Sequence, residues 1–249
     1  MSKLIVLCAL LALPALLQGQ SVAQRVASAP DGTVRMSYAA RPGVCGNGGH
    51  NITITSEGDD SEWETDCAPG PVRVSLRVSG GRVTEARTFV GGRWRAAQGP
   101  TTDLGTVPAA QAAKDLLTLA ERATGDADAL ITGAALADSA VIWADLLRLA
   151  RRSDLPLETR RQAVFWLSQA AGKAATRGLD SITTDESGDL EVRKQAVFAL
   201  SQRPTDEGVP ALIRVARTSP SGELRRSALF WLGQSEDPRA LALFEELLK

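Results

Sequence analysis

The 249-residue chain has few of the side chains on which catalysis and metal binding usually depend. It contains one histidine, His50, and three cysteines, and aromatic residues make up only 4% of it. This leaves little material for a zinc site or for a nucleophile paired with a base. The spacings of serine hydrolases, zinc proteases and phosphate-binding loops are also missing from the sequence. We therefore expect a protein that is not an enzyme and holds neither a cofactor nor a metal.

The chain also lacks a large excess of positive or negative charge. The chain has 28 Lys and Arg residues against 29 Asp and Glu residues, a formal net charge of −1. From Glu158 to Lys249 the numbers are 13 and 13. Nucleic acids and anionic membranes attract basic surfaces, so we expect neither as a partner. With 44% hydrophobic residues the chain can fold, and Leu, Val and Ala must supply most of its core.

One long apolar run is present, and it lies at the N-terminus. Lys3 is the only charged residue before Arg25, and residues 4–17 are almost wholly apolar. This order is typical of a secretory signal peptide, and about 14 apolar residues are too few to span a membrane. We expect the protein to be exported, to a periplasmic or extracellular location, without a membrane anchor after cleavage.

The cleavage site follows from the small residues beyond the apolar run. Ser21 and Ala23 stand at positions −3 and −1 of the bond before Gln24, which predicts that residues 1–23 are removed. Cleavage after Gly19 is the weaker alternative.

Cleavage leaves two cysteines, Cys45 and Cys67. Paired thiols persist as disulfides in oxidising compartments, so we predict that these two are bonded, with two free buried thiols as the alternative. The stretch between them contains six carboxylates within residues 57–66. Such a cluster could bind calcium, but its spacing does not match an EF-hand, and a solvated loop is the favoured interpretation.

Residues 24–105 read as a small β module that carries the disulfide. Val34, Met36 and Tyr38 alternate with polar residues, and so do the segments 72–79 and 82–90 on either side of a Gly-Gly pair. Alternation flanking glycines predicts a β-hairpin. A three-residue loop is preferred, because it pairs apolar side chains on one face and sets Arg77 opposite Glu85.

From about residue 106 the apolar spacing turns helical, and the sequence repeats itself. The segment ETRRQAVFWLSQ at 158–169 recurs as EVRKQAVFALSQ at 191–202 and as ELRRSALFWLGQ at 223–234. A second type alternates with it, since LLRLAR at 146–151 matches LIRVAR two periods later. Recurrence every 32 or 33 residues predicts helical hairpins that stack on their copies.

These segments resemble the HEAT-repeat family, in particular the short, lyase-type HEAT-like repeats of bacterial proteins with a second helix of the form x-R-R-x-A-[VL]-x-x-L-[GS]. The resemblance covers about residues 127–249 and implies an α-solenoid, a right-handed stack of helical hairpins. We thus expect a mainly α protein, with a HEAT-like repeat domain at 106–249 after the β module. The stretch 173–185 departs from the pattern, because its helix signals are weak and Gly178 interrupts it.

The repeated helix has two kinds of recurring position. At 100° per residue, Val192, Ala196, Ala199 and Leu200 form one stripe that should face the partner helix. Other recurring residues lie away from this stripe, and we name them the ladder: Phe165, Gln169, Phe198, Gln202, Phe230 and Gln234, with the basic residues Arg161, Lys194 and Arg226. The ladder either packs between neighbouring repeats or lines a groove that binds an extended partner.

A stack of repeats offers a long curved surface without a deep pocket. We therefore expect an interaction scaffold or adaptor that binds a protein or an extended peptide through the solenoid. In the alternative, the β module binds and the solenoid is a spacer. The resemblance also implies a less favoured alternative, because some HEAT-like repeats occur in bilin lyases and related chromophore-handling proteins.

Overall fold

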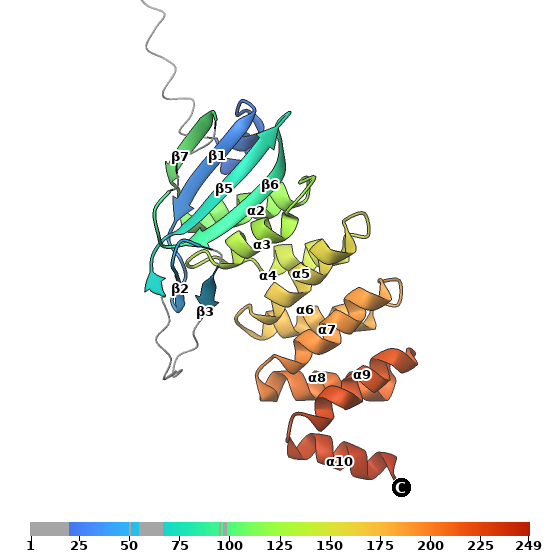
Figure 1. Ribbon diagram of the computed structural model, residues 1–249. Coiled ribbons are helices and arrows are strands. Elements are labelled where there is room, and N and C mark those ends of the chain that lie inside the picture. The colour runs from blue at the N-terminus through green and yellow to red at the C-terminus, as the bar shows by residue number, and fades with distance from the viewer. Residues whose placement is uncertain (1–19, 50, 55–66, 95, 97–98) are drawn as a thin grey trace, which may run out of the picture.

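The computed structural model describes residues 20–249 except 50, 55–66, 95 and 97–98. A β-sheet region lies at one end and leads into a stack of helices that runs to the C-terminus (Figure 1). No helix among the described residues is long and apolar enough to cross a membrane. The expected signal segment up to residue 19, His50 and the acidic stretch 57–66 lie outside the described residues.

The main sheet has four strands in the order β6-β5-β1-β7. Their bounds are β1 Gly32–Tyr38, β5 Val72–Ser79, β6 Arg82–Val90 and β7 Thr101–Thr106. β1 pairs antiparallel with β5 and parallel with β7. Val34, Met36 and Tyr38 are buried as their alternation predicts, so one face of the sheet belongs to the core.

The β5–β6 hairpin confirms the predicted register, with Leu76 opposite Ala86 and Arg77 opposite Glu85. The loop itself is shorter than expected. Gly80 and Gly81 both have positive φ, which is typical of a two-residue hairpin turn. The extra residue lies instead in the β6 strand, where the register shifts between Arg77 and the next position.

A second, smaller sheet has the order β3-β2-β4, with bounds β2 Val44–Gly46, β3 Ile52–Ile54 and β4 Ala68–Pro69. The predicted disulfide is present here. Cys45 and Cys67 are bonded with their Cα atoms 5.2 Å apart, across 22 positions of the chain. The bond holds the start of β4 against β2.

Three helices pack with the main sheet: α1 Val22–Ala27, α2 Ala109–Ala120 and α3 Ala127–Ala135. The hydroxyl of Tyr38 on β1 donates to the carbonyl oxygen of Gly133 on α3 at 2.8 Å, within the buried core. α3 also lies along β6, where Thr88 donates to the Ala129 carbonyl oxygen at 2.8 Å. The α2–α3 hairpin thus covers the apolar face of the sheet.

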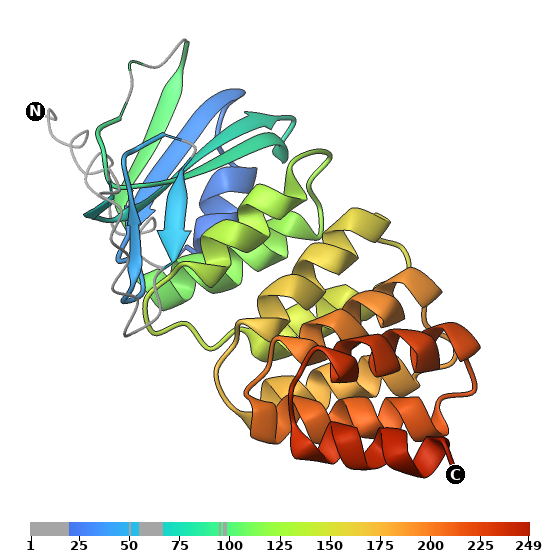
Figure 2. The same ribbon diagram turned by 60° about the horizontal axis from the view of Figure 1, so that its bottom comes forward.

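The remaining helices continue the stack: α4 Trp143–Arg151, α5 Leu157–Ser168, α6 Lys173–Thr184, α7 Leu190–Ser201, α8 Thr205–Thr218, α9 Gly222–Gly233 and α10 Pro238–Leu247. The pairs α4–α5, α6–α7 and α8–α9 form hairpins that follow one another away from the sheet (Figures 1 and 2). Helices α3, α5, α7 and α9 contact one another in order and form one layer, while the even-numbered helices from α2 to α10 form the other. The predicted stack of hairpins is therefore observed.

No gap in the core separates the sheet from the repeats. The expected boundary between residues 105 and 106 falls at the end of β7, but the buried apolar residues form one cluster on both sides of it. The guanidinium of Arg41, just after β1, lies 5.7 Å from the ring centre of Trp166 on α5. Because an end repeat needs its open face covered, the sheet acts as the N-terminal cap of the solenoid.

The stretch with weak helix signals forms the complete helix α6. Gly178 is buried in its middle, where a Cβ atom would lie 3.4 Å from the Leu147 side chain and 3.6 Å from that of Leu167. The missing side chain lets α6 approach α4 and α5 closely. Tertiary packing therefore outweighs the low helix propensity of glycine here.

Candidate interaction surface on the repeats

The three repeated helices, α5, α7 and α9, lie side by side in one layer. In α7, the stripe of Val192, Ala196, Ala199 and Leu200 is buried, as the helical spacing predicts. The ladder residues lie on the same three helices or directly after them, so the structure brings them together on one layer of the stack.

The ladder phenylalanines differ in exposure. Phe165 is 39% exposed and Phe230 is 58% exposed, whereas Phe198 between them is half-buried. The ring of Phe198 lies 5.0 Å from that of Trp231 in the next repeat, and Trp231 also meets Phe230 at 4.9 Å between ring centres. Phe198 thus packs between repeats, while its two counterparts offer exposed aromatic surface.

The ladder glutamines are the C-terminal caps of their helices. Gln169, Gln202 and Gln234 follow α5, α7 and α9 directly, and all three are exposed. The side-chain amide of Gln202 donates to the hydroxyl of Ser201 at 3.1 Å, and that hydroxyl donates to the Phe198 carbonyl oxygen at 2.7 Å. Gln169 repeats this arrangement through the preceding serine. Within the described structure, each of these two amides keeps its carbonyl oxygen and one N–H for a partner.

Two of the three basic ladder residues form surface ion pairs. Arg161 lies 3.5 Å from Glu158 in its own helix. Lys194 lies 3.0 Å from Glu191 on α7 and 3.8 Å from Glu223 on α9, and Arg226 is exposed. Such exposed pairs contribute little to stability, about 0–1 kcal/mol each. They keep the charge of this layer balanced.

Some ladder residues line a cavity of about 280 Å³. It lies where the C-terminal ends of α7 and α9 meet the first turns of α8. Gln202 and Gln234 line it together with Trp231 and Arg203. Two ladder amides and an aromatic ring therefore share one depression between neighbouring repeats.

Residues 182–249 match the family model of HEAT repeats. The matched part runs from the end of α6 through α10, and it contains the ladder residues of α7 and α9. No curated protein matches the chain. The match supports a HEAT-repeat protein, as the recurring motif predicts, while the sheet lies outside the matched residues.

A buried arginine, Arg203, lies in the loop between α7 and α8. The Arg203 side chain is only 5% exposed and lies 3.1 Å from Glu207 on α8, and its Nε donates to the Thr176 hydroxyl at 2.9 Å. The Thr176 hydroxyl also donates to Glu207, and this bond, followed by the Arg203 contact, lowers the pKa of that carboxyl. Ala170 and Ser235 stand at the equivalent positions of the other repeats, so recurrence could not reveal Arg203.

Each repeated helix carries two adjacent basic residues. In α7 and α9 the first of the two donates hydrogen bonds to the end of the preceding helix. Arg193 donates through two nitrogens to the carbonyl oxygen of Thr183, at 3.2 and 3.0 Å. Arg225 donates to the Ser219 carbonyl oxygen at 2.7 Å. Both side chains therefore satisfy carbonyl groups at the end of the preceding helix. The second basic residue of each pair, which is Arg161, Lys194 or Arg226, belongs to the ladder.

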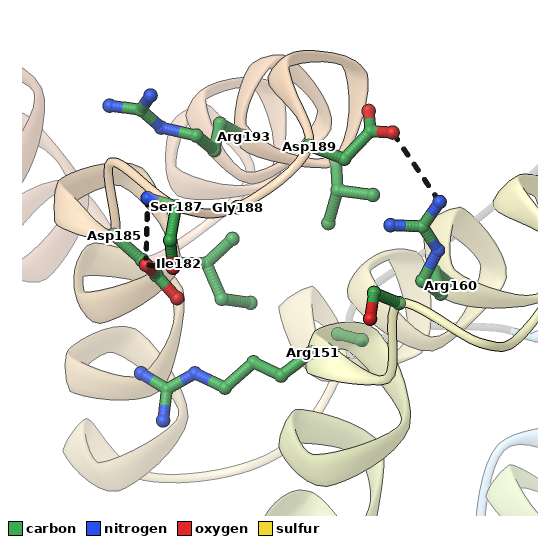
Figure 3. Close-up of a pocket in the computed structure, with 11 residues that line it drawn as sticks. Arg151, Arg160, Ile182, Asp185, Ser187, Gly188, Asp189 and Arg193 are labelled. Carbon is green, nitrogen blue, oxygen red and sulfur yellow. Dashed lines mark hydrogen bonds and ion pairs between the residues drawn. The ribbon is translucent and has the colours of Figure 1, made fainter.

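A cavity of about 360 Å³ lies near the other ends of the repeated helices (Figure 3). Arg160 approaches it from α5 and lies 3.4 Å from Asp189, the residue that caps α7. Asp185 accepts hydrogen bonds from Ser187, which lower the pKa of its carboxyl. Its apolar lining residues are Ala150, Ile182 and Val192. The Ser187 hydroxyl donates to Asp185 at 2.6 Å, so both carboxylates of this cavity already have partners in the structure.

Proposed function

We propose that the protein is an exported, non-enzymatic interaction scaffold. Its ligand is an extended segment of another protein, which binds across α5, α7 and α9 over the ladder. HEAT repeats commonly mediate protein interactions, and the matched repeats contain most of the ladder.

One observation carries this proposal: an exposed glutamine recurs once per repeat on adjacent helices of one layer, beside a phenylalanine that is exposed in α5 and α9. Packed helices lie about 8–10 Å apart. An extended peptide advances about 3.3 Å per residue, so successive repeats would meet it about every third residue. The periodicity of the surface therefore suits a peptide lying across the helices.

The chemistry of the ladder also suits a peptide main chain. A glutamine amide both donates and accepts hydrogen bonds, as the peptide group does. The exposed rings of Phe165 and Phe230 can bury apolar side chains of the ligand. The balanced charge of this region favours neither a nucleic acid nor an acidic membrane.

Two features support export as part of the proposal. The first is the N-terminal order of one lysine, an apolar run and small residues. The second is the bonded pair Cys45 and Cys67, because disulfides persist mainly in oxidising compartments.

The test is selection from a displayed library of random peptides on the purified exported protein, followed by affinity titration of the selected peptides. We expect Phe230→Ala and the double variant Gln202→Ala, Gln234→Ala each to weaken binding at least tenfold. The matched control is Leu241→Ala on α10, which removes an apolar side chain of similar exposure, 61%, from the other layer. Peptides that bind all variants equally, or a library that yields no peptide, would contradict the proposal.

A second candidate function places binding on the sheet. The guanidinium groups of Arg35 on β1 and Arg73 on β5 lie 5.3 and 5.9 Å from the ring centre of Trp94. The two arginines alternate with the buried residues of their strands, so they belong to the polar face of the sheet. Trp94→Ala distinguishes the two candidates without removing the sheet that caps the solenoid. Loss of peptide binding in this variant alone would favour the sheet.

A further inference from the structure

We infer that α1 belongs to the mature protein: the signal peptide is cut at the Gly19–Gln20 bond, and not after Ala23. This inference rests on the export part of the proposed function. It replaces the cleavage site that the small residues alone favour.

The first argument is that α1 is part of the core. Val22 is 3% exposed and Val26 is fully buried, and the helix packs against α2. The end of α1 also touches the β5–β6 turn, where a Cβ atom on Gly81 would lie 2.8 Å from the Ala27 carbonyl oxygen. Cleavage after Ala23 would remove Val22 and uncover apolar surface on α2.

The second argument is a hydrogen bond to a buried carboxylate. The backbone N–H of Val22 donates to Oδ2 of Asp115 at 2.7 Å, and Asp115 is only 5% exposed. The other donor to this oxygen is the side-chain amide of Gln111, at 2.9 Å. A chain that begins at Gln24 would leave this buried carboxylate with one fewer donor, which is unfavourable because buried charges need partners.

The third argument is the cap of the helix. The Ser21 hydroxyl accepts a hydrogen bond from the Gln24 backbone N–H at 3.1 Å, and the Gln24 side chain accepts one from the Ser21 N–H at 2.9 Å. This reciprocal capping box needs both residues. A cut after Ala23 removes one partner and leaves only four residues of α1, which is too few for a stable helix. A cut after Ser21 also breaks the box.

The sequence allows the earlier site. The Gly19–Gln20 bond lies two residues after the apolar run and has the small Gly19 at −1, but Leu17 at −3 is larger than the usual residue there. The residues around a scissile bond do not reveal that Val22 will be buried against Asp115, 93 positions away. The local rule and the fold therefore favour different bonds.

The first experiment is secretion of the full chain from a bacterial host, with intact mass and N-terminal sequencing of the exported protein. We expect the N-terminus to be Gln20 or its pyroglutamyl form. An N-terminus at Val22 or Gln24 would overturn the inference while leaving export intact. A full-length chain that stays in the cell would overturn both the inference and the export proposal.

The second experiment does not depend on export. Chains that start at Gln20 and at Gln24 are produced without the signal segment in an oxidising cytoplasm, and their thermal unfolding is compared. We expect the shorter chain to unfold at least about 5 °C lower. Asp115→Asn should lower the midpoint of the longer chain more than that of the shorter one, because only the longer chain makes the Val22 contact. Equal midpoints for the two starting points would overturn the structural role of α1.

Discussion

A guanidinium N–H of Arg203 donates to the carbonyl oxygen of Ser168 at 2.8 Å, although the two residues are 35 positions apart. The same side chain donates to the carbonyl oxygens of Ala170 and Gly172, at 2.6 and 3.1 Å. Arg203 precedes α8, and the three carbonyls follow or end α5. One side chain therefore fastens two successive repeats together.

Replacement of Arg203 should strongly destabilise the protein. Arg203→Met keeps the apolar stem but leaves three carbonyl groups without this donor and Glu207 with only the Thr176 hydroxyl, so we expect a loss of about 3 kcal/mol. For a chain of this size the unfolding midpoint should fall by about 9 °C. Thermal unfolding by circular dichroism measures it, with Arg177→Met as the exposed control on α6. Equal midpoints for the two variants would contradict this role.

Tyr38 is the only tyrosine of the chain, so its ionisation can be followed directly. Burial raises the pKa of its phenol well above 10. The folded protein therefore holds this proton more tightly than the unfolded chain, and the resulting stability is complete below pH 10 and is lost as the pH rises further. We expect no phenolate absorbance near pH 10 until the protein unfolds. A reversible titration at pH 10 with the fold intact would contradict the burial.

The hydroxyl of Tyr38 should contribute separately from its ring. Tyr38→Phe keeps the ring and leaves the Gly133 carbonyl oxygen without this donor, which we expect to cost about 1–2 kcal/mol in unfolding free energy. Urea unfolding measures the difference. A suitable control is Thr118→Val, whose hydroxyl donates to the Lys114 carbonyl oxygen on the half-exposed side of α2. A smaller effect for Tyr38→Phe than for the control would be inconsistent with a buried hydrogen bond.

Reduction of the Cys45–Cys67 bond should weaken the smaller sheet. A loop of 22 positions corresponds to a stabilisation of about 3 kcal/mol in the chain-entropy treatment. Unfolding of the mature protein with and without reductant measures this, and Cys45→Ser, Cys67→Ser is the control that should not respond to reductant. Two thiols that alkylate in the native, unreduced protein would refute the bond.

The last helix should respond to acid through its cap. The Asp237 carboxylate accepts hydrogen bonds from the Arg239 side chain and backbone N–H, which lower its pKa to about 2. The stabilisation of α10 is therefore present above the ordinary pKa and is lost as the pH falls through about 2. Amide hydrogen exchange of α10 across this pH range measures the loss of stability. In Asp237→Asn, which keeps a capping acceptor without the charge, this pH dependence should disappear.

Removal of the sheet should unfold the repeats nearest to it. Deletion of residues 20–107 uncovers α2 and α3, including Leu116 and Ile131, which are fully buried. Deletion of residues 236–249 is the matched truncation at the other end, where α10 buries only Ala240 and Leu243. We expect the first truncation to aggregate or unfold without cooperativity and the second to keep a cooperative transition. Cooperative unfolding of the chain without its sheet would contradict the capping role.

The sequence by itself determined the parts that repeat or alternate. Three copies of one twelve-residue segment define the helices α5, α7 and α9 and the stripe that each buries, because the 3.6-residue period is a local property. Period-two alternation likewise defined β1 and the register of β5 with β6. The expectation of export predicted a bond between Cys45 and Cys67, with two free thiols as the alternative, and the structure contains the bond.

Only the tertiary structure decided which recurring residues face inward and where the folded unit begins. Phe198 is covered by Trp231 while Phe230 stays exposed, although the two occupy equivalent positions. Arg203 has no counterpart in the other repeats, and Val22 lies outside them. Their roles depend on Ser168 and Asp115, which are distant in the chain. The physical reason is that burial and hydrogen-bond partnership are properties of contacts between elements, and a local pattern does not contain them.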